Sequence, residues 1–148
     1  MIGTVLDTVG NTPLVKIEKL NPNPAVTIYA KLEGNNPGGS VKDRPALNMI
    51  RSALERGEIT SQTKLIEATS GNTGIAMALM ARLYGLQIEL IMPSTSTRER
   101  VLTMEAFGAK VILLDSMEAC RDYAEEKSFQ GDYYLLNQFA NEDNYLAH

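Results

Sequence analysis

Segments with helical patterns and segments with strand patterns alternate along residues 41–136 of this 148-residue chain. Apolar residues at helical spacing mark four segments, and short apolar runs typical of strands mark four others. The helical segments are 41–56, 72–84, 97–107 and 116–127, and the strand segments are 64–68, 87–92, 110–114 and 133–136. Such alternation with short connections predicts a parallel sheet with right-handed crossovers. We therefore expect an α/β fold, a three-layer open parallel sheet with helices on both faces.

Punctuating residues support these boundaries. Pro45 must lie in the first turn of its helix, because a proline further in would break it. Gly57, Gly85 and Gly108 each fit just past a helix end. The near-continuous apolar run at 88–92 predicts a strand that is buried on both faces.

The two ends of the chain have different patterns. Residues 12–17 and 26–33 look like strands joined through a turn that contains Pro22 and Pro24. They predict either an additional antiparallel pair or an arm that reaches another domain. Residues 137–148, after the last predicted strand, show no closing element.

Composition excludes several classes of protein. With 14 basic and 18 acidic residues the net charge is −4, which argues against a nucleic-acid-binding face. No apolar run approaches the length of a membrane span, and the N-terminus lacks the pattern of a signal peptide. The single cysteine, Cys120, lies in a helical segment, where we expect it to pack. We expect a cytoplasmic protein without a metal site.

The turn Ala68-Thr69-Ser70-Gly71-Asn72-Thr73-Gly74 follows a predicted strand and opens a helix. Its hydroxyls, its amide and the free backbone N–H groups of the helix start all donate hydrogen bonds, and its glycines allow close approach. An ordinary helix cap would explain one hydroxyl and one glycine, not the whole run. The segment therefore predicts a site for a carboxylate or a phosphate.

A second glycine-rich turn, residues 34–44, places Lys42 at the start of a helix. The spacing does not match a phosphate-binding Walker loop. A cationic or dry environment disfavours the ammonium form of a lysine and makes a nucleophilic amine available, as Schiff-base chemistry requires. Surface lysines also occur at such positions, so the turn alone leaves both interpretations open.

The two turns together resemble the signature motifs of the cysteine synthase (O-acetylserine sulfhydrylase) family of fold-type II enzymes that use pyridoxal 5'-phosphate (PLP). The motif runs are GNNPGGSVKDR at 34–44 and ATSGNTG at 68–74. Similar runs occur at 10–17, 31–33, 91–100, 107–114 and 137–148, so the resemblance covers essentially the whole chain. The residues of the first motif resemble those of the B-type enzymes more closely.

The resemblance implies a role for each motif residue. Lys42 would bind PLP covalently and later take the α-proton of the amino-acid substrate, and Asn72 would hydrogen-bond the cofactor's ring hydroxyl. The substrate carboxylate would be bound by Thr69, Ser70, Gly71, Thr73 and Gln138. The implied reaction is a β-replacement that forms L-cysteine from O-acetylserine and sulfide or another sulfur donor, in a homodimer.

The resemblance also implies parts that lie downstream in the family, above all the cup that holds the PLP phosphate. We therefore expect residues 37–148 to be a small α/β domain and residues 1–36 to be a β segment that packs partly on a larger domain. The 148-residue chain alone is expected to be inactive.

Other functions remain open on the sequence. Cystathionine β-synthases and serine/threonine dehydratases share the fold. A non-catalytic truncated paralogue would instead use the polar turn at 69–74 to dock the carboxyl terminus of a partner.

Overall fold

The computed structural model describes residues 3–131 and 133–148, and it confirms the predicted alternation of helices and strands. The strands are β1 (Leu14–Ile17), β2 (Ile28–Lys31), β3 (Lys64–Ala68), β4 (Gln87–Pro93), β5 (Lys110–Leu114) and β6 (Tyr133–Leu135). The helices are α1 (Asp43–Glu55), α2 (Asn72–Leu83), α3 (Arg98–Ala106), α4 (Met117–Phe129) and α5 (Glu142–Tyr145), with 3-10 turns η1 (Val5–Thr8) and η2 (Glu33–Asn35). Each segment predicted between residues 41 and 136 is present, with ends that shift by two residues or fewer.

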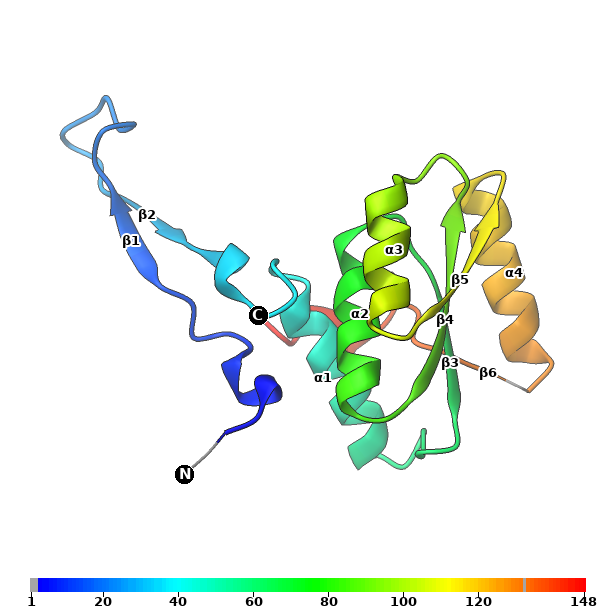
Figure 1. The fold of residues 1–148 in the computed structure, drawn as a ribbon. Helices are drawn as coiled ribbons and strands as arrows, with labels where there is room; N and C mark the ends of the chain where they lie inside the picture. The colour runs from blue at the N-terminus through cyan, green and yellow to red at the C-terminus, as the bar shows by residue number, and fades with distance from the viewer. Residues whose placement is uncertain (1–2, 132) are drawn as a thin grey trace.

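Strands β3 to β6 form one parallel sheet in the order β5-β4-β3-β6. Helix α4 covers one face, and α1, α2 and α3 lie on the other, which confirms the three-layer fold (Figure 1). The chain places β4 and β5 to one side of β3 and then returns β6 to its other side. Ligands of open parallel sheets bind outside the carboxyl ends of the strands where the strand order reverses in this way, so the fold points to the end of β3.

Two apolar layers hold the sheet between its helices. The larger layer packs α1 and α2 on one face, with Met49, Met80 and Leu90 fully buried. The smaller layer lies under α4 and contains Ile91 and Cys120, so the cysteine packs as expected. Among the described residues, no helix combines the length and apolar character needed to cross a bilayer.

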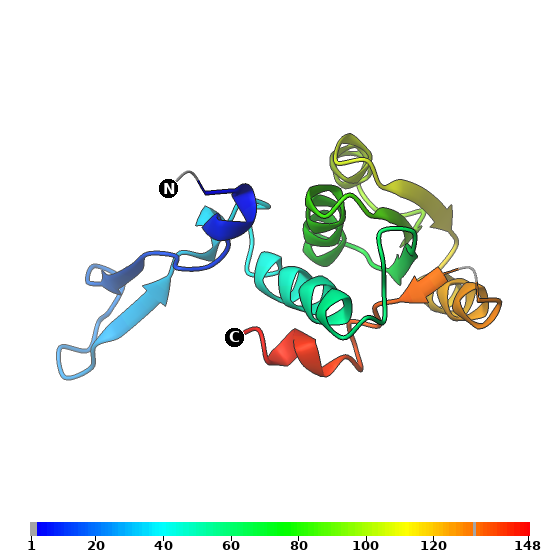
Figure 2. The same cartoon turned by 90° about the horizontal axis from the view of Figure 1, so that it is seen from below.

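The N-terminal strands form an antiparallel pair that projects away from the sheet (Figures 1 and 2). We call this pair and its connecting turn, residues 14–31, the arm. Leu14 pairs with Lys31 and Ile17 with Ile28. Leu14 is 61% exposed and Ile28 is 42% exposed, which is unusual for strand residues of this kind. The predicted antiparallel pair is confirmed, and its packing on another domain stays a prediction.

The segment after β6 does contain a closing element, which the sequence analysis did not foresee. Helix α5 is a single turn, too short to show a helical period, and it lies against α1 (Figure 2). The Asn48 amide donates to the carbonyl of Asp143 at 2.9 Å, and Arg56 pairs with the Asp143 carboxylate at 2.9 Å. These side-chain contacts, between residues far apart in sequence, fold the end of the chain back over α1.

Candidate active site

A cavity of about 470 Å³ opens at the carboxyl edge of the sheet, beside the ends of β3 and β6. All of the residues that the sequence analysis placed in the site line it, from three separate segments: the start of α1, the turn between β3 and α2, and the chain after β6. They are Lys42, Thr69, Ser70, Gly71, Asn72, Thr73 and Gln138. The fold therefore brings the predicted amine and the predicted anion-binding turn into one cavity.

Lys42 is presented by a turn that is cross-linked by its own hydrogen bonds. The backbone N–H of Lys42 donates to Ser40 Oγ at 3.1 Å, and the Asn36 amide donates to the Ser40 carbonyl at 3.0 Å. Gly39 has a φ of +85°, in the left-handed region that favours glycine. Within residues 3–131 and 133–148 the Lys42 ammonium group makes no hydrogen bond or ion pair, which leaves the amine available to a ligand.

Asp43, next to Lys42, anchors the same turn from inside. Its side chain is fully buried, and one carboxylate oxygen accepts the backbone N–H of Gly38. Burial raises the pKa of the Asp43 carboxyl, against the opposing effect of that hydrogen bond. The sequence analysis missed this residue, because an acidic residue in the first turn of a helix is ordinarily an exposed partner of the helix dipole.

The turn between β3 and α2 is fixed by backbone contacts at its base. Thr69 is buried; its N–H donates to the carbonyl of Ile91 at 2.9 Å, and its Oγ1 accepts the N–H of Gly74 at 3.1 Å. Asn72 and Thr73 begin α2, so their backbone N–H groups have no partner within the helix. These free donors and the positive end of the helix dipole face the cavity region, as an anion-binding turn requires.

Gln138 is held close to that turn by hydrogen bonds on both sides. Its side-chain amide donates to the carbonyl of Ala68 at 3.0 Å, and its own carbonyl accepts the Asn144 amide at 2.6 Å. The preceding residue, Asn137, has a left-handed φ of +54°. The chain after β6 therefore makes a tight bend that places Gln138 against the end of β3.

The cavity has further lining residues that sequence reasoning did not single out. Arg100 donates to the carbonyl of Ser70 at 3.1 Å, and the Arg121 guanidinium lies over the Phe139 ring at 4.5 Å. Met117 also lines the wall. Arg100 lies within the family-like run 91–100 and Phe139 within 137–148, so those runs were the available signal.

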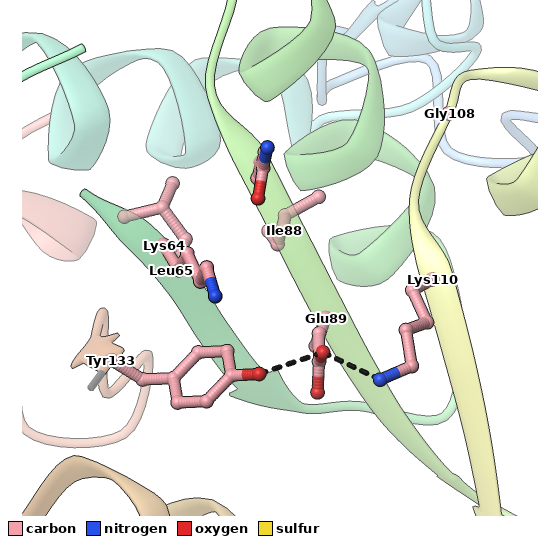
Figure 3. A pocket seen from close by; sticks show the side chains of 8 residues that line it. Lys64, Leu65, Ile88, Glu89, Gly108, Lys110 and Tyr133 are labelled. Atoms are coloured by element: carbon pink, nitrogen blue, oxygen red, sulfur yellow. Dashed lines mark hydrogen bonds and ion pairs between the residues drawn. The ribbon is translucent and has the colours of Figure 1, made fainter. Parts of the chain in front are cut away.

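A second cavity, of about 340 Å³, lies toward the amino-terminal ends of the strands (Figure 3). Glu89 accepts the Tyr133 hydroxyl and the Lys110 ammonium group, both at 2.7 Å, and Lys64 lies 5.8 Å from the centre of the Tyr133 ring. We call these four side chains the β-sheet ion cluster. Its central carboxylate is already paired, and its members lie on all four strands of the parallel sheet, so the cluster is explained by sheet stability.

Comparisons with known proteins agree with this geometry. Residues 5–148 match the family described as pyridoxal-phosphate dependent enzyme. The chain is 51% identical to cysteine synthase B of Salmonella typhimurium over 99% of its own length and 50% of that protein. It is 52% identical to cysteine synthase B of Pseudomonas syringae pv. syringae, over 98% of this chain and 88% of that one.

A solved structure shares the fold as well. The crystal structure of cysteine synthase from Entamoeba histolytica superimposes with a TM-score of 0.93 at 37% identity, over all of this chain and 46% of that one. The chain spans about half the length of most of the curated relatives it matches. Fold, site geometry and a match over nearly all its residues lead to one conclusion: the chain belongs to the family of pyridoxal-phosphate-dependent enzymes.

Proposed function

We propose that the full-length protein is a PLP-dependent cysteine synthase that forms L-cysteine and acetate from O-acetylserine and sulfide. The observation that carries this proposal is the meeting of Lys42 with the turn 69–73 in one cavity. The chain is 51% and 52% identical in sequence to two relatives named cysteine synthase B. This similarity supports cysteine synthesis over the reactions of the dehydratases and the cystathionine β-synthases.

The residues of the cavity fit PLP and an amino acid. PLP needs a lysine amine that is free of protein partners, and Lys42 meets that requirement. An amino acid needs donors for its carboxylate, which Ser70, Thr73 and the start of α2 supply. The cofactor's phosphate would be bound by residues of the longer protein. We therefore propose that the 148-residue chain alone binds PLP weakly and does not turn over.

Each proposed role is a task for one side chain. When bound, PLP supplies the electron sink for negative charge at the substrate α-carbon. Lys42 Nζ would hold the cofactor and would also accept the α-proton of the substrate. Asn72 would donate to the cofactor's ring hydroxyl. The hydroxyls of residues 69–73 and the free backbone N–H groups at the start of α2, with the Gln138 amide, would bind the substrate carboxylate while sulfide replaces acetate at the β-carbon.

Covalent labelling tests the central assignment. The full-length protein is loaded with PLP and reduced with borohydride, which makes the bond between lysine and cofactor permanent, and the labelled peptide is identified by mass spectrometry. We expect the label on Lys42, together with cysteine formation from O-acetylserine and sulfide. Lys42→Ala is expected to abolish both the label and the visible absorbance of bound PLP.

Two other lysines provide matched controls. Lys31, at the end of the arm, donates to the carbonyl of Thr12, and Lys64 lies in the β-sheet ion cluster. Lys31→Ala and Lys64→Ala should retain both signals. A label on either of these lysines would refute the assignment of Lys42. A colourless full-length protein that binds peptide carboxyl termini would instead favour the non-catalytic protein that docks a partner.

We further propose that residues 37–148 form the small domain of the full-length protein and that residues 1–36 pack partly on a second domain. The exposed apolar side chains of the arm support this arrangement, as does the greater length of the relatives. Limited proteolysis of the full-length protein, followed by peptide mapping, should find the arm protected there and cleaved in the 148-residue chain.

We also propose that the full-length protein is a cytoplasmic homodimer. The buried free thiol of Cys120 is compatible with a reducing compartment, and burial raises its pKa, which keeps it unreactive. Cell fractionation and light scattering would test the two parts separately.

A further inference from the structure

A buried carboxyl group lies on β3, two residues before the polar turn of the candidate carboxylate site. Glu67, on β3, is only 2% exposed, and no lysine, arginine or histidine of the described residues forms an ion pair with it. It immediately precedes Ala68 and Thr69, with which the polar turn begins. Glu67 has no role in the proposed reaction.

Glu67 and Gln138 are joined across the gap between β3 and the chain after β6. The backbone N–H of Gln138 donates to Glu67 Oε2 at 3.4 Å, and the side-chain amide of Gln138 donates to the adjacent carbonyl of Ala68 at 3.0 Å. Two contacts from one residue to consecutive positions of β3 fix both the backbone and the side chain of Gln138.

The bend that carries Gln138 begins beside this contact. Asn137 adopts a left-handed φ of +54°, a conformation that is uncommon outside glycine and that asparagine tolerates better than most residues. The Gln138 N–H donates to the Glu67 carboxyl, and burial raises the pKa of that carboxyl to about 7 against the opposing effect of hydrogen bonding. Because burying a carboxyl is costly, an apolar residue would serve better if filling space were the only requirement.

We propose that Glu67 is a positioning residue of the substrate-carboxylate site, holding the Asn137–Gln138 bend so that the Gln138 amide stays beside the turn 69–73. The inference rests on the proposed function, since it takes an amino-acid carboxylate as the ligand of that turn. Glu67 does not touch the ligand and acts only through Gln138.

Two substitutions separate positioning from packing. Glu67→Gln keeps an acceptor oxygen for the Gln138 N–H, and Glu67→Met fills the same space without one. Packing alone predicts that the methionine variant binds ligand normally, since methionine fills the same space. Positioning predicts that the methionine variant stays folded and yet binds ligand less tightly.

The test uses the full-length, PLP-loaded protein and L-methionine, an amino acid without a leaving group on its β-carbon, with calorimetry as the readout. We expect Kd to rise about tenfold in Glu67→Met and to stay within about threefold in Glu67→Gln, as the loss of one hydrogen bond from an oriented site implies. Thermal melting of each variant is recorded alongside, so that a loss of folded protein is recognised.

A double-mutant cycle with Gln138→Ala gives the decisive comparison. If Glu67 acts through Gln138, adding Glu67→Met to Gln138→Ala should raise Kd no further, whereas independent effects would multiply. Glu89→Met, in the β-sheet ion cluster at the opposite edge, is the matched control and should leave Kd unchanged.

Each outcome has a distinct meaning. Normal affinity in Glu67→Met, or losses that multiply in the double variant, would overturn the positioning role while leaving the proposed function intact. A parent protein that carries PLP on Lys42 but fails to bind L-methionine or O-acetylserine would instead overturn the assignment of the turn 69–73, and the inference with it.

Discussion

Arg44 binds Glu33 through two parallel hydrogen bonds, 2.8 Å from Nε to Oε2 and 2.9 Å from a terminal nitrogen to Oε1. The same guanidinium donates to Thr12 Oγ1 at 3.1 Å, and Thr12 in turn donates to Glu33 at 2.7 Å. Asn36 joins the group by donating to Glu33 Oε2 at 2.9 Å. We call these four residues the arm junction, because they connect the base of the arm to the first turn of α1.

The arm junction explains several family-like runs that do not line the cavity. Thr12 lies in the run 10–17, Glu33 in the run 31–33, and Arg44 two residues after Lys42. Their shared task is to fix the turn that presents Lys42, since Asn36 also donates to the carbonyl of Ser40. The motifs of the sequence thus divide into residues that line the site and residues that hold its lysine segment in place.

Arg44→Lys is predicted to destabilise the chain even though it conserves charge. A lysine ammonium group cannot make the paired, planar contact of a guanidinium, so at least one hydrogen bond to the partly buried Glu33 is lost. We expect a loss of about 1–3 kcal/mol in the free energy of unfolding. Urea unfolding measures it. Arg51→Lys, in an exposed pair with Glu55, is the control and should change little; equal effects would contradict the role of the junction.

The buried Glu67 carboxyl leads to a separate prediction about how stability depends on pH. Its pKa is about 7 in the folded chain and near the ordinary value of 4.5 once exposed, because burial penalises the ionised form. Between pH 4.5 and 7 the folded state therefore holds a proton that the unfolded state has released. Stability should fall through this window by up to roughly 3 kcal/mol and level off above it.

Glu67→Gln should remove that component of the pH dependence. The free energy of unfolding of the parent and of the variant is measured at pH 4.5 and pH 8. Between these two pH values the variant should lose less stability than the parent. Arg121 and Glu125, both on α4, line the same cavity as Glu67, and they are unchanged in the comparison. Parallel pH profiles for the two proteins would show that Glu67 keeps an ordinary pKa.

The sequence predicted the layers of the fold and the main residues of the site, and the reasons are local. Helix α2 and strand β4 carry their periodicity in consecutive residues, and the polar turn 69–74 follows a strand and opens a helix. The contacts that sequence reasoning missed join distant residues: Asn48 to Asp143, Gln138 to Glu67. A glutamate inside a strand, such as Glu67, has the pattern of an exposed position, yet it is only 2% exposed on a strand in the interior of the sheet.

Gly74→Ala is predicted to distort the base of the polar turn. A Cβ at Gly74 would lie 2.5 Å from Thr69 Cγ2 and 2.7 Å from Met104 Cε, so both side chains would have to move. We expect a loss of about 1–3 kcal/mol, as for overpacking elsewhere. Gly34→Ala is the matched control, because a Cβ there meets nothing within 4 Å. Equal melting temperatures for the two variants would contradict the close approach of α2 to Thr69.

Substitutions within the polar turn should separate substrate binding from cofactor binding. Ser70→Ala and Thr73→Ala each remove one hydroxyl, which should weaken the binding of O-acetylserine by about 0.5–1.5 kcal/mol, or about 1.5–3 kcal/mol if the hydroxyl contacts the carboxylate charge. Asn72→Ala should mainly change the visible absorbance of bound PLP. Ligand titration of the full-length variants measures both, and unchanged affinity in the two hydroxyl variants would remove the turn from the substrate site.

The arm should make the 148-residue chain associate when it is studied alone. In the register of β1 and β2, one face of the arm carries Val15, Ile17, Ile28 and Ala30, with Ile17 directly opposite Ile28. A two-stranded pair with an uncovered apolar face is only marginally stable in water, and the unpaired backbone groups at its edges can pair with another chain. We predict that the chain elutes from size exclusion as oligomers whose share grows with concentration. Ile28→Lys should shift it toward monomer, and Lys16→Gln, on the opposite face of the arm, should not. A chain that stays monomeric at every concentration would show that this face is not a contact surface.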